Sequence, residues 1–322
     1  MKSLRFGILA SLVLAAACGS GGSGDGGGDG DGDGDGDGSP DAGDPPPAEG
    51  FRITTPDIAI QPGEEVTYCY YTTLPTTREM GVKEWSSIMT PGSHHLILFF
   101  AQGASKPDGT IERDCEGLGG GGLQVPYWAY SAQTPTQVTP MPSGVGMKVP
   151  AGQKVYVQMH YLNTSDQVIN AHVQIDGEAY AAAETYTPAA AFVTYSAGFT
   201  VPANGTGEAG NSCSIAAGSK FFLMSTHAHK RATLTQVTDG TTMVFESDNW
   251  EHPGATTWAA EPFFQFASNK LTYRCEYDNT GNPNAVPEGS SAATNEMCMA
   301  VGYFFPAPNG PRFCLNGFVV GG

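Results

Sequence analysis

The sequence predicts an all-β protein built from two antiparallel β-sandwich domains. Aromatic and β-branched residues, which favour strands, are plentiful, and no long stretch has the periodicity of an amphipathic helix. The 43 Gly and 23 Pro residues recur between short apolar runs, as turns do between antiparallel strands. Once the N-terminal segments are set aside, enough chain remains for two sandwiches of roughly 130 residues each, an ordinary domain size.

Residues 1–18 have the pattern of an export signal. Lys2 and Arg5 precede the almost wholly apolar run 6–17, and small residues end it. The run Leu-Ala-Ala-Ala-Cys-Gly at 14–19 resembles a bacterial lipobox, in which Cys18 is lipidated and becomes the mature N-terminus. The alternative is an ordinary cleaved signal peptide that happens to be followed by Cys. The apolar run is too short for a stable transmembrane helix.

Residues 19–50 are predicted to be a disordered tether. They consist of Gly/Asp repeats followed by three prolines, so they have no apolar surface to bury and should be extended. Weak calcium binding is the alternative, but the spacing of a calcium loop is missing. Gly19 replaces the Asp that retains many enterobacterial lipoproteins at the inner membrane. We therefore expect a lipid-anchored protein of the bacterial cell envelope, at the outer membrane, on its periplasmic face or at the cell surface.

The net charge of −17 excludes one class of partner. Nine of the 32 acidic residues lie in the tether and two of the 15 basic residues lie in the leader. The remaining region holds 23 acids against 13 bases, a net charge of −10. Nucleic-acid binding needs a basic face, so no nucleic-acid partner is expected.

Two sets of strands are expected in the folded region. The first set comprises residues 65–71, 96–100, 154–161 and 171–175, of which the last two should pair with each other. A lower-complexity stretch at 181–191 separates the sets and divides the chain into domains at 51–183 and 184–322. The second set begins near residue 192 and comprises 197–201, 220–224, 232–237, 242–246, 270–277 and 298–305.

The cysteine count fits an oxidising compartment. With Cys18 assigned to lipid, an even number of cysteines remains, two in the first domain and four in the second. A Cys69–Cys115 disulfide follows if pairing stays within domains, whereas the other four allow three pairings. No Cys-x-x-Cys spacing occurs, which argues against thiolate metal ligands. The four cysteines of the second domain are Cys213, Cys275, Cys298 and Cys314.

Five of the seven histidines form a candidate metal-ligand set. His227 and His229 end an apolar run, and residues i and i+2 of a strand point to one face, so both can bind one ion. Such a pair is weak evidence alone, because surface strands carry it by chance. The adjacent pair His94–His95 and the single His160 strengthen it. The other two, His172 and His252, lie in polar surroundings and suggest no role.

A methionine points to the identity of the metal. Met297 begins the last long strand, and a thioether together with imidazoles favours copper over zinc, particularly Cu(I). The alternative is that Met297 fills the core, as most of the ten methionines should. Ligand chemistry alone does not select Met297 over Met299 or Met224.

Four motifs together resemble the successive copper motifs of the copper type II, ascorbate-dependent monooxygenases. Their order, their division between the two halves and the adjacency of the ligand Met to a Cys all match. The similar region runs from about residue 51 to 306, with supporting stretches at 127–130, 144–146 and 197–199. The four motifs are Ser-His-His-Leu at 93–96, Val-Gln-Met-His-Tyr at 157–161, Thr-His-Ala-His at 226–229 and Glu-Met-Cys at 296–298.

The resemblance implies a fold and two copper sites. The fold would be two jelly rolls that face each other across a solvent-filled cleft. One copper would be held by His94, His95 and His160, and the other by His227, His229 and Met297. Adjacent histidines face opposite ways in a regular strand, so the strand that follows Pro91 and Gly92 should be distorted at its start. The disulfides implied for the second domain are Cys275–Cys298 and Cys213–Cys314.

The implied chemistry is hydroxylation of an unactivated C–H bond of a small organic substrate. Ascorbate or a similar one-electron reductant would reduce both coppers, and O₂ would bind at His227, His229 and Met297, the catalytic set. The other copper would supply the second electron. Gln158 and Tyr161 flank a ligand and are expected to orient it.

The sequence departs from the family's pattern where substrate is bound. Amidating members carry an Arg two residues before the first His of the His-x-His pair, and this chain has Ser225 there. They also have an Asn and a Tyr shortly after the ligand Met, where this chain has Met299 and Val301. A carboxylate clamp of their kind is therefore missing, and nothing marks an amine pocket.

Two other functions compete with the monooxygenase. A non-catalytic lipoprotein on the same scaffold would buffer or deliver copper, but six ligands split between two domains exceed what one such site needs. A jelly-roll module that binds carbohydrate or a surface would explain the sandwiches and leave the ligand set unexplained. Consumption of O₂ with ascorbate separates the enzyme from both, and copper stoichiometry separates the other two.

Overall fold

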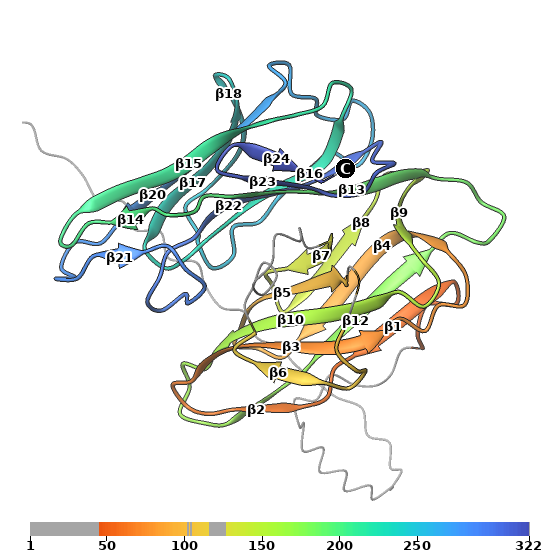
Figure 1. The fold of residues 1–322 in the computed structure, drawn as a ribbon, viewed down its shortest axis with the longest axis horizontal. Coiled ribbons are helices and arrows are strands. Elements are labelled where there is room, and N and C mark those ends of the chain that lie inside the picture. Colours follow the sequence, from red (N-terminus) through yellow and green to blue (C-terminus); the bar gives the residue numbers. More distant parts are fainter. Residues whose placement is uncertain (1–44, 102, 104, 116–126, 322) are drawn as a thin grey trace, which may run out of the picture. The chain divides into compact units, whose positions relative to one another are not determined.

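The computed structural model describes residues 45–101, 103, 105–115 and 127–321 (Figure 1). All described residues belong to one compact unit, which contacts place within Pro40–Gly322. The predicted leader, the lipidation site Cys18 and the tether as far as residue 44 lie outside the described residues. No helix that could cross a membrane is found in the part of the chain that the structure describes.

The described residues form strands and no helix, so the predicted all-β class is confirmed. The largest sheet has eleven strands and a main path β1-β12-β4-β9-β13-β22-β16-β19. Three further strands branch from it: β8 pairs with β4, β23 with β13, and β24 with β23. Its strands are β1 (Gly50–Thr54), β4 (Met80–Met89), β8 (Thr136–Pro140), β9 (Val145–Val149), β12 (Val173–Ala179), β13 (Thr187–Tyr195), β16 (Lys220–Ala228), β19 (Thr256–Thr257), β22 (Cys298–Phe305), β23 (Arg312–Leu315) and β24 (Phe318–Val320).

A five-stranded sheet belongs to the first half of the chain and a four-stranded sheet to the second. The five-stranded order is β6 (Ile111–Arg113), β3 (Glu65–Thr73), β10 (Lys154–Leu162), β5 (Ser93–Phe100) and β7 (Tyr127–Ala132). The four-stranded order is β15 (Thr206–Ser214), β20 (Lys270–Asp278), β17 (Ala232–Asp239) and β18 (Thr242–Ser247). Two short pairs complete the set: β2 (Ile58–Ile60) with β11 (Ile169–Ala171), and β14 (Thr200–Val201) with β21 (Val286–Pro287).

Two hydrophobic clusters hold these sheets together. The first contains residues of β3, β5, β7 and β10 and of β1, β4, β9 and β12, with Trp85 and Phe99 among its fully buried side chains. The second contains residues of β15, β17 and β20 and of β13, β16 and β22, including Tyr273 and Phe221. Each cluster is centred on one half of the chain, but the first also includes residues of β13, β16 and β22 from the second half. The predicted boundary between residues 183 and 184 stays a prediction.

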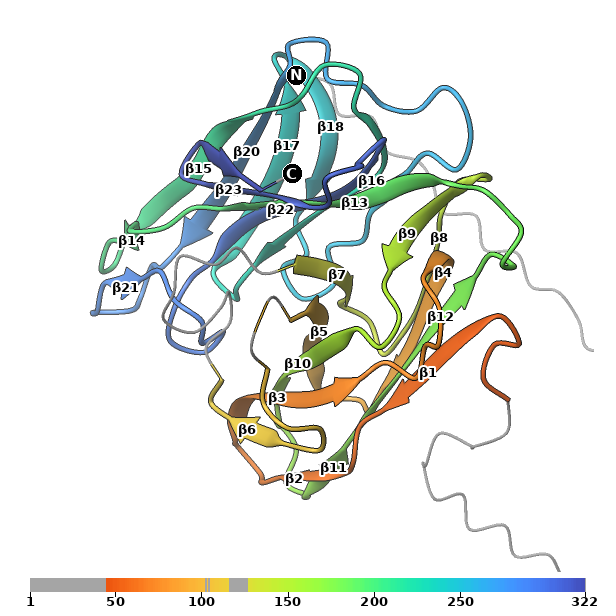
Figure 2. The same cartoon turned by 45° about the vertical axis from the view of Figure 1, so that its right-hand side comes forward.

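Strand β22 contributes to both clusters. Residues along a strand alternate between its faces, and Met299, Val301 and Tyr303 belong to the first cluster. The intervening Ala300 and Phe304 belong to the second. All eight residues of β22 are buried, which explains why the sequence there is continuously apolar. Figure 2 shows the four-stranded and five-stranded sheets on opposite sides of this strand.

One predicted strand pairing is wrong. Residues 171–175 were expected to pair with 154–161, but β10 is flanked by β3 and β5, which occupy both of its edges. The chain instead breaks at His172: β11 pairs with β2, and β12 pairs with β1 and β4. The buried side chains of β12, Val173 and Ile175, belong to the first cluster and reach it from the eleven-stranded sheet, whereas β10 belongs to the five-stranded sheet. Closeness in sequence did not decide the pairing.

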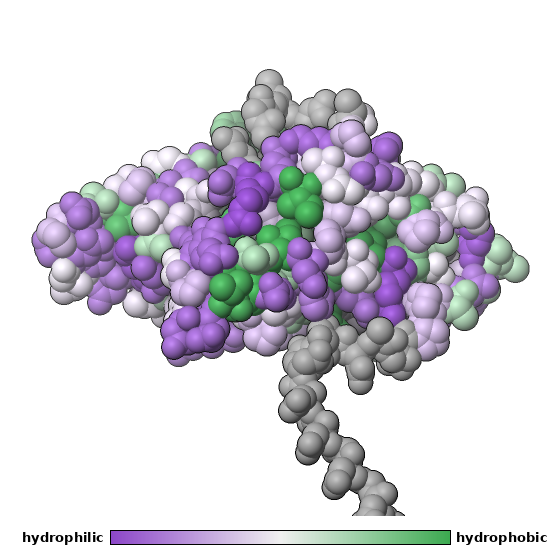
Figure 3. Space-filling view, turned by 90° about the horizontal axis from the view of Figure 1, so that it is seen from below, coloured by the Kyte–Doolittle hydropathy of each residue, from purple (hydrophilic) through white to green (hydrophobic). Residues whose placement is uncertain are grey.

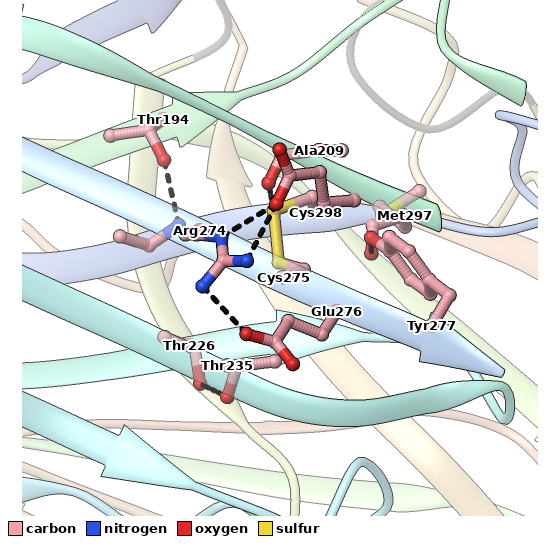
Figure 4. Close-up of a disulfide and its surroundings, with 12 residues drawn as sticks. Thr194, Ala209, Thr226, Thr235, Arg274, Cys275, Glu276, Tyr277, Met297 and Cys298 are labelled. Atoms are coloured by element: carbon pink, nitrogen blue, oxygen red, sulfur yellow. Dashed lines mark hydrogen bonds and ion pairs between the residues drawn. A yellow bond between two sulfur atoms is a disulfide. The ribbon is translucent and has the colours of Figure 1, made fainter. Parts of the chain in front are cut away.

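Three disulfides are present, and they join the pairs that were expected. Cys69–Cys115 joins β3 to the segment after β6, and Cys213–Cys314 joins β15 to β23. Cys275–Cys298 joins β20 to the first residue of β22 (Figure 4). This last bridge holds the four-stranded sheet against the strand that lies between the two cores.

The exterior is mainly hydrophilic on the face drawn in Figure 3. Hydrophilic side chains there surround several separate small hydrophobic patches. Several exposed charges are paired across neighbouring strands, as in the ion pairs Lys83–Glu178 and Arg274–Glu208. Exposed pairs of this kind contribute little to stability, about 0–1 kcal/mol each.

Candidate metal centre

The five predicted histidine ligands converge in one cluster. Ring-centroid distances are 5.2 Å from His95 to His160, 5.0 Å from His94 to His227 and 5.5 Å from His227 to His229. Strands β5, β10 and β16 supply four of them, and His229 directly follows β16. Four of the side chains are buried and that of His95 is half-buried. Residues far apart in the sequence thus form a single imidazole cluster.

A bulge lets adjacent histidines reach this cluster together. In the pairing of β10 with β5, His160 lies opposite His95, but the next residue, Tyr161, lies opposite Ser93. His94 is therefore an extra residue in β5, and such a residue turns its side chain away from the regular alternation. This is the distorted strand start that the two adjacent histidines were expected to need.

Each of the five rings has a nitrogen without a hydrogen-bond partner among the described residues. His160 Nε2 donates to Glu65 Oε1 at 2.9 Å, and His227 Nδ1 donates to Gln133 Oε1 at 2.7 Å. His229 Nδ1 donates to the Asn295 carbonyl at 3.3 Å. These bonds fix the tautomers and leave a lone pair on the opposite nitrogen of each ring. The unpartnered buried nitrogens are His94 Nδ1 and Nε2, His95 Nδ1, His160 Nδ1, His227 Nε2 and His229 Nε2.

The electrostatic environment keeps four of the five rings neutral. Burial, reinforced by the neighbouring imidazoles, lowers the pKa of His94, His95 and His229 well below the ordinary value of 6.5. The same causes lower the pKa of His227 to about 3. A neutral imidazole is the form that binds a metal ion, and an unpartnered buried nitrogen is costly without one. The cluster therefore fits a bound metal, with imidazole donors suited to copper or zinc.

The closest donor atoms do not follow the predicted division into two sets. Nitrogens of His94, His95 and His227 lie within 4.8 Å of one another. Two of these residues were assigned to the first copper and one to the second. The structure brings all five histidines together, and their division between two ions stays a prediction.

Met297 lines the cavity that three of the five histidines also line. It immediately precedes β22, is half-buried against the first core, and lines a cavity together with His95, His160 and His227. Its backbone carbonyl accepts a hydrogen bond from the Tyr277 hydroxyl at 2.8 Å (Figure 4). The Cys275–Cys298 disulfide at the next residue fixes the start of β22, the strand that Met297 precedes.

Sequence reasoning missed three groups that orient the rings. Glu65 lies on the strand paired with β10, two residues from the partner of His160 and so on the same face. Gln133 follows β7 and also donates from Nε2 to the Thr226 carbonyl at 3.2 Å, which fixes its amide orientation. The backbone carbonyl of Gln133 accepts a hydrogen bond from His252 Nδ1 at 2.7 Å. Only the strand pairing could have indicated Glu65, and no local pattern marks Gln133 or Asn295.

Glu65 also joins the two halves of the chain. Its Oε2 accepts from Ser291 Oγ at 2.8 Å and its Oε1 from the Ala293 N–H at 3.3 Å. Burial alone would raise the pKa of this carboxyl, but hydrogen bonds from His160 and Ser291 outweigh burial and lower the pKa to about 2. An ionised carboxylate on His160 makes the imidazole a better ligand.

The two residues that were expected to orient a ligand have other contacts. The Tyr161 hydroxyl donates to the His172 carbonyl at 3.4 Å, and its ring stacks on Tyr68. Gln158 is buried and lines the cavity, and its Nε2 has no partner among the described residues. Their orienting role stays a prediction.

The cavity beside the histidines has a volume of about 1000 Å³. The five-stranded sheet supplies one part of its wall, including Ile97 and Trp128, and β16 and β22–β24 supply another, including Leu223 and Phe313. This volume lies at the upper end of the range for pockets that bind small organic molecules.

No protein-family model matches the chain, and no curated protein matches it.

Proposed function

We propose that this chain is a copper-dependent monooxygenase that hydroxylates a C–H bond of a small organic molecule with O₂ and ascorbate or a similar one-electron reductant. One observation carries the proposal: five histidines with unpartnered nitrogens form one cluster, and three of them line, together with Met297, a cavity large enough for an organic substrate. The sequence resemblance to the copper type II monooxygenases supports the same conclusion independently of this geometry.

Two coppers are proposed, with the ligand sets that the resemblance implies. His94, His95 and His160 would hold the first, and His227, His229 and Met297 the second. Bound copper would supply one-electron chemistry, with O₂ activation at the second set and a stored electron at the first. The thioether of Met297 would favour the reduced ion, and the hydrogen bonds of Glu65, Gln133 and Asn295 would hold the rings in place.

The wider arrangement is also proposed from these observations. Two hydrophobic cores, each centred on one half of the chain, support two jelly-roll domains at 51–183 and 184–322. Wall residues from both halves support a cleft between them that admits substrate. The chain would be lipid-anchored at Cys18 in the bacterial cell envelope, at the outer membrane.

The cavity favours the enzyme over a copper-buffering lipoprotein. Buffering requires ligands alone, whereas here His95, His160, His227 and Met297 border a space of about 1000 Å³. A bound substrate there would lie next to the proposed oxygen-activating ligands and exclude water from them.

The test begins with the copper content of the reconstituted chain and continues with its reaction with O₂. We expect two coppers per chain, and we expect the ascorbate-reduced protein to consume O₂ and add one oxygen atom to a molecule in a mixed library, detected by mass. Met297→Ala and His160→Ala should each abolish the mass gain, the first at O₂ activation and the second at electron supply. Two coppers without O₂ consumption would indicate the buffering function. One copper per chain would overturn the two-site assignment and indicate a shared His94/His95/His227 site.

A further inference from the structure

The charge of the cavity wall restricts what the cavity can bind. None of the described residues that line it is Lys or Arg, and Glu288 is the only acid. Both oxygens of Glu288 already have partners, because Oε1 accepts from the Tyr195 hydroxyl and Oε2 accepts from the Gly198 N–H at 3.2 Å. No Lys or Arg among the described wall residues could pair with a ligand carboxylate or phosphate, and a ligand ammonium would have to displace the bonds of Glu288.

Most of the wall is apolar. Met299, Val301 and Tyr303 project from one face of β22, and β23 and β24 add Phe313, Leu315 and Phe318. Burying an unpaired charge against such a wall is expensive, whereas burying apolar surface is favourable. The wall therefore selects an uncharged, mainly apolar molecule.

Three buried donors in the wall lack partners in the described part of the chain, and the Tyr303 hydroxyl is one of them. Trp128 Nε1 and Gln158 Nε2 have no hydrogen bond among the described residues, and their side chains are 5% and 3% exposed. Both side chains line the cavity. Buried donors are normally satisfied, so an oxygen acceptor on the ligand would complete them.

The exposed part of the cavity lining is also apolar. Phe318, Leu315 and Val320 line the cavity and are 77%, 42% and 43% exposed. Exposed apolar side chains that gather at one place often mark a binding site. An apolar ligand would contact them before it reaches the histidines.

We propose that this cavity binds an uncharged, largely apolar organic molecule that carries a carbonyl or similar oxygen acceptor, and that this molecule is the substrate class of the enzyme. That this molecule is the substrate rests on the proposed function, whereas its binding to the cavity does not. Carboxylates, phosphates and primary amines are excluded as preferred ligands. The apolar wall holds the carbon skeleton, and Trp128 and Gln158 fix the oxygen.

The test measures binding to the mature chain without copper, so that it is independent of catalysis. Nile red, an uncharged fluorescent dye with a carbonyl, should bind one molecule per chain. It should then be displaced by 2-undecanone at concentrations at least tenfold lower than by undecanoate or undecylamine. Equal or better displacement by the carboxylate or the amine, or no saturable Nile red binding, would overturn the proposal. Loss of O₂ consumption with this binding intact would count only against the proposed function.

Two variants make the test specific to the cavity. Thr257 is exposed on the short edge strand β19 and lines the cavity, so Thr257→Arg should raise undecanoate affinity at least threefold. Thr256→Arg, one residue away on the same strand and outside the lining, is the matched control and should leave the preference unchanged. Trp128→Phe keeps an aromatic ring and removes the N–H, so it should weaken the ketone severalfold and leave undecane unchanged. Equal effects on ketone and hydrocarbon would contradict the role of the N–H.

Discussion

Glu65→Gln tests whether the hydrogen bond to His160 supports a metal site. The substitution keeps the size of the side chain and removes the negative charge of the carboxylate. The oxygens of this carboxylate now accept hydrogen bonds from His160 Nε2, Ser291 Oγ and the Ala293 N–H. The amide can present only one oxygen acceptor in place of two. His160 should therefore lose both orientation and basicity as a ligand.

The expected loss is about 10- to 100-fold in copper affinity, as for other carboxylates that hold a ligand histidine. Each factor of ten corresponds to about 1.4 kcal/mol. The affinity should be measured by competition with a colorimetric Cu(I) chelator under ascorbate. Because the carboxylate also contacts the loop before Met297, we expect the first copper to be weakened most and the second to a smaller extent.

A neighbouring acid provides the control. Glu64 pairs with Arg113 and accepts from the Gln61 N–H at 2.7 Å, so Glu64→Gln removes the same charge from the same end of β3. It should leave copper affinity within about twofold of the wild type. Equal copper affinities in Glu65→Gln and Glu64→Gln would show that the hydrogen bond from His160 to Glu65 has no bearing on metal binding.

Two further predictions concern the disulfides and the N-terminus. Replacing Cys275 and Cys298 together by Ala should lower the free energy of unfolding by about 3 kcal/mol, the chain-entropy value for a loop of this length. The same double variant should lower the affinity for the copper that the neighbouring Met297 is proposed to bind. The Cys69/Cys115 double variant should destabilise the chain and leave copper affinity unchanged. Denaturant titration and copper competition measure the two effects, and equal copper losses in both variants would contradict the prediction. Cys18→Ala should release the protein from the membrane fraction while copper binding persists, and an unmodified N-terminus in the mature wild type, found by mass spectrometry, would disprove lipid anchoring.

The strands were predictable where their residues carry a strong local pattern. Residues 298–305 form β22 with the predicted bounds, because a strand between two cores must be apolar throughout. The alanine-rich β13 was missed, since small side chains give little strand signal although they allow β13 to pack between the same two cores. The partner of residues 171–175 was wrong because both edges of β10 were taken by β3 and β5.

The histidines of the site were predictable and their supports were not. The spacing of His227 and His229 and the adjacency of His94 and His95 are local patterns that metal sites favour. Gln133 comes from a loop and reaches His227, 94 residues later in the chain, so its role depends on tertiary structure alone. His252 appeared irrelevant in its polar surroundings, yet it lines the cavity and bonds to the Gln133 carbonyl.

X-ray absorption of the copper-loaded, ascorbate-reduced protein tests most directly whether Met297 and the histidines form a copper site. We expect a copper–sulfur contribution in the wild type that disappears in Met297→Ala. Met299→Ala is the matched control, since Met299 lines the same cavity two residues further along; the contribution should persist there. A wild-type spectrum with nitrogen ligands only, or a sulfur contribution that survives in Met297→Ala and disappears in Met299→Ala, would contradict the assignment.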